Sequence, residues 1–160
     1  MKKIYFYDTS KKTKVEFVSL KPNIAKIYVC GPTVYDNSHL GHARSAIAFD
    51  LLHRALKANG YEVVFAKNFT DIDDKIIKKM KEEGKTLEEI TTFYIKNYKN
   101  DMEILNILPN SFEPKATENL DAMKEMIENL LSKDIAYKTD DSVYFDVSKD
   151  KNYGSLSNQA

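Results

Sequence analysis

The stretch Tyr28-Val-Cys-Gly-Pro-Thr-Val-Tyr-Asp-Asn-Ser-His-Leu-Gly-His-Ala-Arg44 predicts the end of a buried strand, a tight connection and the first turn of a long helix. Its first residues are strand formers, and Gly31 and Pro32 stop a strand. Asn37 and Ser38 carry side chains that can cap a helix by accepting hydrogen bonds from its free N–H groups. A strand that runs into a helix N-terminus in this way creates a site for an anion.

His39 and His42 lie three residues apart and therefore share one face of the opening helical turn. Both imidazoles would point the same way as the unpaired backbone N–H groups, where the helix dipole favours negative charge. Gly41 costs about 1 kcal/mol of helix stability relative to alanine, and its missing side chain would let a flat ring or a phosphate approach the backbone. A second interpretation is that the two histidines are merely polar side chains that solvate the start of a helix. The pair alone does not decide between the two interpretations.

The composition sets wide limits on function. The 160 residues, 42% of them hydrophobic, suffice for a sizeable core in one domain, or in one domain with an appendage. The 24 basic and 24 acidic residues cancel and are interspersed, so charge neither supports nor excludes an RNA partner. Apolar runs fall far short of the roughly 20 residues of a membrane span, and no secretory segment is visible, so we expect a cytoplasmic protein.

Cys30 is the only cysteine, which rules out an intramolecular disulfide and fits a reducing compartment. At the end of a core strand it is first interpreted as a small buried hydrophobe, with a catalytic thiolate and a metal ligand as the alternatives. The sequence contains no Cys-x-x-Cys, no His-Glu-x-x-His and no calcium-loop spacing of carboxylates. It therefore shows no complete metal site.

Strand, helix and strand follow one another at Ile24–Cys30, Leu40–Asn59 and Glu62–Lys67, which predicts a parallel βαβ unit with a right-handed crossover. The apolar stripe expected to face the core consists of Ala46, Phe49, Leu52 and Leu56, whereas His53 is interpreted as an ordinary surface or satisfied histidine. Ligands of such sheets bind beyond the carboxyl ends of the strands. That rule places four positions at one rim: Cys30, Gly31, Thr33 and the stretch Asn68–Asp74.

Thr70 is the predicted N-cap of a helix over Asp71–Glu83. Its first-turn acids Asp71, Asp73 and Asp74 are interpreted mainly as charges that stabilise the helix start, although Thr70 and Asp73 also stand where they could contact a bound amino acid. The other predicted elements are a hairpin of Ile4–Tyr7 and Val15–Val18, a helix from Thr86 to about Ile107, a Pro-punctuated loop over 108–114, a helix over Thr117–Lys133, and a hairpin of Ala136–Lys138 and Val143–Val147. The expected core-facing residues of the two later helices are Ile90, Phe93, Tyr94, Tyr98, Met102 and Leu105, and Leu120, Met123, Met126, Ile127, Leu130 and Leu131.

Two strings carry a resemblance to a known family. His39-Leu-Gly-His42 resembles the adenylate-forming signature of class I aminoacyl-tRNA synthetases, and the whole stretch 28–44 resembles cysteinyl-tRNA synthetases in particular. Asn68-Phe-Thr-Asp-Ile-Asp-Asp-Lys-Ile76 resembles the same family, and similar segments continue to Tyr153-Gly-Ser-Leu-Ser157. The resemblance implies an α/β fold: the first half of a Rossmann-type parallel-sheet nucleotide-binding fold over 1–114, then a helical segment and a short hairpin of the connecting insertion over 115–160.

The resemblance also implies a reaction: ATP and cysteine form cysteinyl adenylate, and the cysteine then passes to tRNA(Cys). It implies that His39 and His42 stabilise phosphate charge as catalytic residues, and that Thr33, His39, Gly41 and His42 bind ATP, which enters with magnesium. The implied cysteine-binding residues are Cys30, Gly31, Thr33 and Thr70. Cys30 is also the implied zinc ligand, and zinc would select a thiol over the hydroxyl of serine.

The family's Lys-Met-Ser-Lys-Ser loop and its helical anticodon-reading domain do not occur in these 160 residues. We therefore expect an N-terminal piece of a protein that is a monomer at full length, and we expect the piece alone to be inactive and to bind zinc weakly or not at all. Three alternatives stay open: a cysteine ligase that acts on an amino sugar, as in the mycothiol pathway; a nucleotidyltransferase with a His-x-Gly-His site, a class that lacks both long strings; and a non-catalytic binding module derived from a synthetase.

Overall fold

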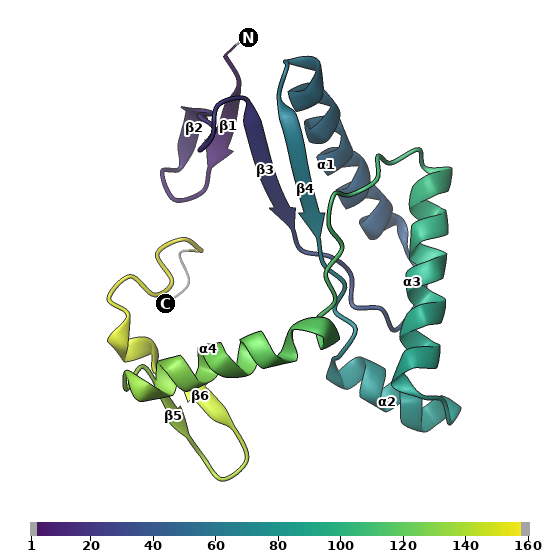
Figure 1. Cartoon of the computed structure of the whole chain (residues 1–160), viewed down its shortest axis with the longest axis vertical. Helices are drawn as coiled ribbons and strands as arrows, with labels where there is room; N and C mark the ends of the chain where they lie inside the picture. The colour runs from purple at the N-terminus through teal and green to yellow at the C-terminus, as the bar shows by residue number, and fades with distance from the viewer. Residues whose placement is uncertain (1–2, 158–160) are drawn as a thin grey trace. The chain divides into compact units, whose positions relative to one another are not determined.

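The computed structural model describes residues 3–157, which fall into two compact units (Figure 1). One unit is Ser19–Glu118, and the other consists, among the described residues, of the N-terminal segment 3–18 and the C-terminal segment 119–157. The predicted rim lies wholly within the first unit. The fold class is α/β, as predicted from the sequence.

The first unit is built on a parallel strand pair. β3 (Ile24–Val29) and β4 (Glu62–Lys67) pair in register from Ile24 opposite Glu62 to Val29 opposite Lys67. The helix that connects them, α1 (Leu40–Ala58), lies beside the pair, and both strand arrows point toward the same end (Figure 1). The predicted strand, helix and strand are therefore confirmed. In the sequence they appear as two β-branched, apolar runs on either side of an uninterrupted helical pattern.

A third segment runs alongside β4, where the sequence predicted only a loop. Ala66 bridges to Phe112 and Phe69 to Lys115, both in the parallel sense. The N–H of Lys67 donates to the carbonyl oxygen of Phe112 at 3.0 Å, and that of Phe69 donates to Pro114 at 2.9 Å. Residues 111–116 thus occupy the place of a third parallel strand, which gives the βαβαβ order of half a Rossmann-type sheet.

The hydrophobic core of this unit lies directly behind the rim. Its fully buried members are Val34, Phe69, Ile76, Ile90 and Tyr98. Val34 and Phe69 come from the segments that leave the two strands, and the other three come from α2 (Asp74–Glu83) and α3 (Leu87–Ile104). Because each buried side chain of this size stabilises the fold by about 1.5–3 kcal/mol, the backbone of the rim is held by its own core residues.

Helix boundaries and faces differ from the predictions in several places. α1 is capped by His39 rather than by Asn37 or Ser38. α2 begins at Asp74 with Asp73 as its N-cap, so Thr70 is not a cap. α3 has the predicted capping box but ends at Ile104. Some stripe residues expected in the core are exposed instead: Phe49 by 37%, Phe93 by 55% and Leu105 by 38%.

The second unit contains both predicted hairpins. They are β1 (Tyr5–Asp8) with β2 (Thr13–Glu16), and β5 (Ala136–Lys138) with β6 (Val143–Phe145), and both pairs are antiparallel. The predicted helix over Thr117–Lys133 divides into a 3-10 turn, η1 (Thr117–Asn119), and α4 (Leu120–Ser132), and a second 3-10 turn, η2, covers Val147–Lys149. The apolar stripe of α4 was expected to face inward, but four of its residues are exposed by at least 38%: Leu120, Met123, Met126 and Ile127. Within residues 3–157, no helix is both long and apolar enough to cross a membrane.

Candidate active site

The chain segments that leave β3 and β4 continue side by side beyond the sheet. Thr33 and Thr70 form a parallel bridge. The N–H of Val34 donates to the carbonyl oxygen of Thr70 at 3.1 Å, and the N–H of Thr70 donates to that of Pro32 at 3.0 Å. The structure therefore brings the four predicted cysteine-pocket residues to one rim, while their roles stay predictions: Cys30, Gly31, Thr33 and Thr70.

Asn68 holds this rim together through its side chain. Its Oδ1 accepts hydrogen bonds from the N–H of Gly31 at 2.8 Å and from the hydroxyl of Tyr28 at 2.9 Å. Its Nδ2 donates to Oγ1 of Thr70 at 3.3 Å. Sequence reasoning placed Asn68 in a family string but assigned it no role. The sequence signal that could have indicated this role is the position of Asn68 directly after a strand, because its amide side chain offers both a hydrogen-bond donor and an acceptor.

Gly31 is a glycine because the backbone of Asn68 passes against it. A Cβ atom at position 31 would lie 1.5 Å from the carbonyl oxygen of Asn68. Real side chains essentially never make such a contact, and a backbone carbonyl cannot swing aside as a flexible side chain can. The close approach therefore fixes the separation of the two segments that form the rim.

Cys30 is exposed, so its first interpretation as a small buried hydrophobe is wrong. The side chains of a strand alternate between its two faces, and Val29 takes the buried position while Cys30 takes the open one. Its sulfur lies 3.7 Å from the carbonyl oxygen of Gly31. An accessible thiol at the rim is free to meet a ligand, as the metal-ligand and thiolate alternatives require.

His39 and His42 cap the start of α1 reciprocally. Nδ1 of His39 accepts from the N–H of Gly41 at 3.0 Å, and Nδ1 of His42 accepts from the N–H of His39 at 3.2 Å. The two rings lie 4.0 Å apart between centroids. An imidazole whose Nδ1 accepts a hydrogen bond carries its proton on Nε2 when neutral. Each ring is therefore set to offer an Nε2–H donor to an acceptor outside the helix.

Partial burial lowers the pKa of His42, and the positive charges of His39 and Lys67 lower it further. Lys67 has a lowered pKa as well, chiefly because of burial, while Cys30 and Glu113 act in the opposite direction. Lys67 is therefore close enough for its charge to act on His42.

The space beside Gly41 is occupied by the side chain of His39. A Cβ atom at this position would lie 2.7 Å from Cε1 and 2.9 Å from Nδ1 of His39. The missing side chain was predicted to let a ligand approach the backbone. In the structure the ring of His39 already occupies that space, so a side chain at position 41 would have to displace the ring of this capping residue.

The three acids after Thr70 have separate roles. Asp73 caps α2 by accepting from the N–H of Lys75 at 2.9 Å, and Asp74 lies in the first turn. Asp71 is buried, with 2% exposure, and accepts hydrogen bonds from both the N–H and the hydroxyl of Thr117. The interpretation of Asp71 as a simple helix-start charge is therefore wrong: it ties the rim segment to the 3-10 turn that precedes α4.

Replacing Asp71 with alanine is expected to lower the free energy of unfolding by about 2 kcal/mol, because the N–H and the hydroxyl of the half-buried Thr117 lose their carboxylate acceptor. Asp71→Asn keeps one acceptor oxygen and should cost less. The matched control is Asp74→Ala, an exposed first-turn acid whose loss costs roughly 0.5 kcal/mol. Urea unfolding of the three variants measures these differences, and an equal cost for the changes at 71 and 74 would contradict the assigned role.

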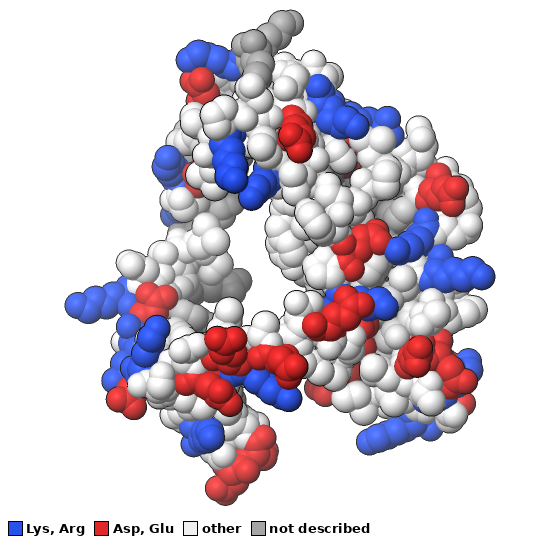
Figure 2. All heavy atoms as spheres, in the orientation of Figure 1, with Lys and Arg blue, Asp and Glu red and all other residues white. Residues whose placement is uncertain are grey.

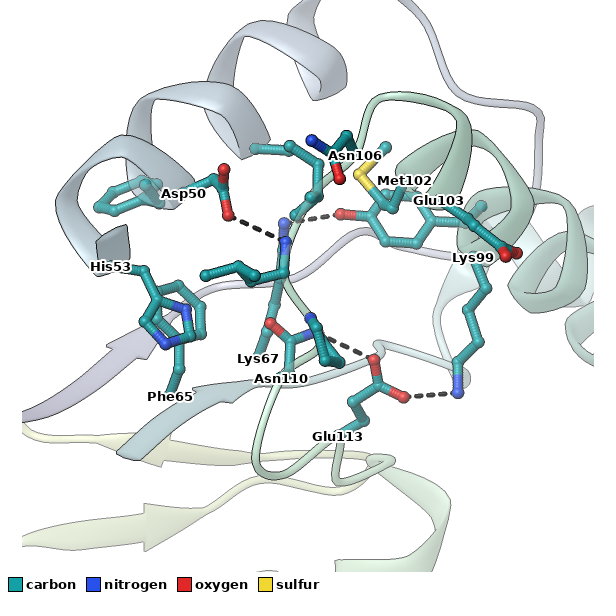
Figure 3. A pocket seen from close by; sticks show the side chains of 16 residues that line it. Asp50, His53, Phe65, Lys67, Lys99, Met102, Glu103, Asn106, Asn110 and Glu113 are labelled. Carbon is teal, nitrogen blue, oxygen red and sulfur yellow. Dashed lines mark hydrogen bonds and ion pairs between the residues drawn. The ribbon is translucent and has the colours of Figure 1, made fainter. Parts of the chain in front are cut away.

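The main cavity of this unit lies between α1, α3, β4 and the segment 105–113, and encloses about 480 Å³ (Figure 3). The described residues that line it include none of the predicted site residues. At one end, the ring of His53 stacks on Phe65 with centroids 5.3 Å apart, so His53 is a buried residue whose pKa burial lowers. Elsewhere in the wall, Lys67 donates a 2.6 Å hydrogen bond to the hydroxyl of Tyr98, and burial raises the pKa of Tyr98 to about 12. No sequence pattern indicates this cavity, because its walls come from elements distant in the chain.

No three His, Cys, Asp or Glu side chains gather to hold a metal ion anywhere in residues 3–157. Asp71 and Asp73 are engaged in other contacts, which leaves Cys30 as the residue of the rim whose chemistry suits zinc. Its sulfur is accessible, so the residue fits one position of a zinc coordination sphere. The remaining ligands would have to come from outside the described residues.

The 160-residue chain, stripped of metal and then equilibrated with zinc, is expected to retain well below one equivalent after dialysis against buffer, because one thiolate cannot hold zinc tightly. Any weak binding should disappear in the Cys30→Ser variant. Atomic absorption measures both. Retention of a full equivalent that survives this substitution would show that residues 1–160 contain a complete site that does not use Cys30.

Comparison with known proteins finds a matching family model and similar sequences. Residues 16–160 match the family model of the tRNA synthetases class I (C) catalytic domain. The cysteine–tRNA ligase of Aliarcobacter butzleri (strain RM4018) is 68% identical over 160 residues, which are all of this chain and 34% of that protein. The enzyme of the same name from Campylobacter lari is 57% identical over 152 residues, which cover 95% of this chain and 33% of that protein. The chain thus spans about a third of the length of the curated relatives it matches.

A solved structure supports the fold. The LeuRS of Agrobacterium radiobacter K84, from a ternary complex with tRNA and LeuAMS, superposes with a TM-score of 0.64 over 74% of this chain and 16% of its own length, at 22% identity. That likeness agrees with a partial Rossmann-type sheet. Figure 2 shows Lys and Arg interspersed with Asp and Glu on the visible face of the molecule, as the equal numbers of both charges led us to expect.

Proposed function

Because the chain belongs to the family of class I (C) tRNA synthetase catalytic domains, we propose that it forms the cysteine- and ATP-facing first part of a cysteine–tRNA ligase. The observation that carries the proposal is the rim beyond the ends of β3 and β4. Thr33 and Thr70 are bridged there, Cys30 exposes its thiol, and the histidine cap of α1 begins six residues after Thr33 in the chain. An amino acid and a nucleotide would bind at these adjacent positions.

In the first step, a carboxylate oxygen of cysteine bonds to the α-phosphorus of ATP, the bond from that phosphorus to its bridging oxygen breaks, and pyrophosphate leaves. Nε2–H groups of His39 and His42 donate to the phosphate oxygens as negative charge builds on them. The lowered pKa of His42 suits a neutral donor that need not transfer its proton. In the second step, a ribose hydroxyl of tRNA(Cys) attacks the carbonyl carbon of the adenylate and AMP leaves.

The residues of the rim would select cysteine over other amino acids. Gly31, Thr33 and Thr70 line the pocket, and the backbone approach at Gly31 sets its width. Zinc, when bound, would supply a soft Lewis acid that distinguishes a thiol from the hydroxyl of serine, and Cys30 is the residue of this chain that would hold it. Magnesium enters with ATP, as nucleotide phosphates commonly require.

The wider arrangement is part of the same proposal. Residues 1–114 form the first half of the catalytic domain, and 115–160 begin the segment that connects its halves. The full-length enzyme acts as a monomer in the cytoplasm, where tRNA is charged. Its partners are cysteine, ATP and tRNA(Cys).

The test is a chimera in which residues 1–160 replace the corresponding part of the Aliarcobacter butzleri relative, which is 68% identical over that span. The chimera is expected to catalyse cysteine-dependent exchange of pyrophosphate into ATP and to charge tRNA(Cys). The parent relative is the positive control. A folded chimera that shows neither activity, or one that activates cysteine but transfers it only to an amino sugar, would refute the proposal.

A further inference from the structure

The cavity between α1, α3 and β4 contains an ammonium group that has no ionic partner among residues 3–157. Lys67 lies on the same face of β4 as Phe65, two residues earlier, so its side chain passes between the sheet and the helices (Figure 3). The hydroxyl of Tyr98 accepts its hydrogen bond at 2.6 Å. Lys67 is half-buried, and no carboxylate oxygen of the described chain lies within 4.0 Å of its Nζ, although a charge withdrawn from water is normally paired.

Three carboxylates line the cavity: Glu103 forms no ion pair with Lys67, and Asp50 and Glu113 are engaged elsewhere. Asp50 pairs with Nε of Arg54 at 2.6 Å and accepts from the N–H of Leu108 at 2.9 Å. Glu113 accepts from Nδ2 of Asn110 at 2.9 Å and pairs with Lys99 (Figure 3). Asp50 or Glu113 would have to break two interactions in order to pair with Lys67. The cation is therefore left for a group that enters from outside.

The rest of the wall would hold an apolar body. Aromatic and aliphatic side chains from all the surrounding elements line the cavity: Phe49, Phe65, Met102, Ile107, Leu108 and Pro109. Its volume of about 480 Å³ lies within the range of small-molecule sites, roughly 300–1,000 Å³. Small-molecule sites are usually lined by apolar walls with a few polar groups that orient the ligand.

We propose that this cavity is a binding site for a small organic carboxylate, with its carboxylate on Nζ of Lys67 and the hydroxyl of Tyr98 and its apolar part against the aromatic wall. A single negative charge fits better than a phosphate dianion, because the two lysines of the cavity wall, Lys67 and Lys99, are outnumbered by three acids: Asp50, Glu103 and Glu113. The site does not involve the rim residues, and it does not depend on the function proposed above.

The probe is 3-phenylpropionate, titrated into the 160-residue chain and followed by NMR shifts of the methyl group of Met102 and the ring of Phe65. Saturable shifts at these two residues are expected. The uncharged 3-phenylpropanamide should bind at least about tenfold more weakly, since it lacks the charge-assisted hydrogen bond. Phenyl phosphate, the dianionic probe, should also bind more weakly than the carboxylate.

Three variants complete the test. Lys67→Met keeps the length of the side chain and should reduce carboxylate binding at least about tenfold while leaving the amide unchanged. Lys67→Arg should retain carboxylate binding, which shows that a cation and not the fold is needed. Lys26→Met, an exposed lysine of β3, is the matched control and should bind as the original chain does. Absence of saturable carboxylate binding, equal binding by Lys67→Met, or tighter binding of phenyl phosphate would overturn the proposal.

Discussion

Alanine at position 31 is expected to lower the free energy of unfolding of this chain by about 3 kcal/mol or more, a large effect for one added methyl group. The new Cβ atom would lie 1.5 Å from the carbonyl oxygen of Asn68, so the two rim segments must separate. Overpacking of a well-packed site typically costs about 1–3 kcal/mol, and here the obstacle is backbone rather than a mobile side chain. The separation would also stretch the 2.8 Å hydrogen bond from Gly31 to Asn68.

Two other glycines serve as controls. Gly84 has a φ of +64°, and a Cβ atom placed there would meet no atom of the described residues within 4 Å, so Gly84→Ala should cost only about 1 kcal/mol of backbone strain. Gly41→Ala displaces one flexible imidazole, and the better helix propensity of alanine offsets part of that cost. Denaturant midpoints of the three variants give the order. A Gly31→Ala protein as stable as Gly84→Ala would show that the rim adjusts freely.

The second prediction concerns the histidine cap. In the chimera described above, changing His39 and His42 together to alanine is expected to reduce cysteine-dependent pyrophosphate exchange by roughly 10²–10³-fold or more, the size usually found when a preorganised donor to developing charge is removed. The reduction should appear in kcat more than in KM for cysteine, because the donors act on phosphate charge that builds in the transition state.

The same substitutions also remove a helix cap, so a structural effect must be separated from a chemical one. Loss of the cap should lower the unfolding free energy by only about 1 kcal/mol. His39→Asn combined with His42→Ala provides the comparison, because asparagine caps helices well but places its donor elsewhere. It should restore stability without restoring exchange. Recovery of both by asparagine would show that the histidines matter only as caps.

The elements with strong local patterns were predictable from the sequence, whereas the contacts between distant segments were not. The strand, helix and strand of the first unit and both hairpins of the second appear as predicted, since each carries its own periodicity and turn residues. Residues 111–116 do not, because Pro109 and Pro114 suggest a loop and only the partner strand β4 supplies the hydrogen bonds that make them strand-like.

The candidate site shows the same limit. A rim at the strand ends followed from the topology of parallel sheets, and the structure brings Thr33 and Thr70 together there. The bridging role of Asn68 and the burial of the Lys67 ammonium against Tyr98 depend on which side chains meet across 30 residues or more of intervening chain. Local propensity contains no such information. Asp71 was misread for this reason, since its partner Thr117 lies 46 residues away.

The segment 111–116 on the far side of β4 has a consequence for how amide hydrogens exchange with solvent. β4 is bordered by β3 on one edge and by this segment on the other, so its N–H groups are bonded alternately to both sides. Exchange of these amides requires separation of a neighbouring strand, whereas the outer edge of β3 has no described strand beside it. In deuterium oxide, the amide of Lys67, which is bonded to the carbonyl oxygen of Phe112, should therefore be among the last to exchange.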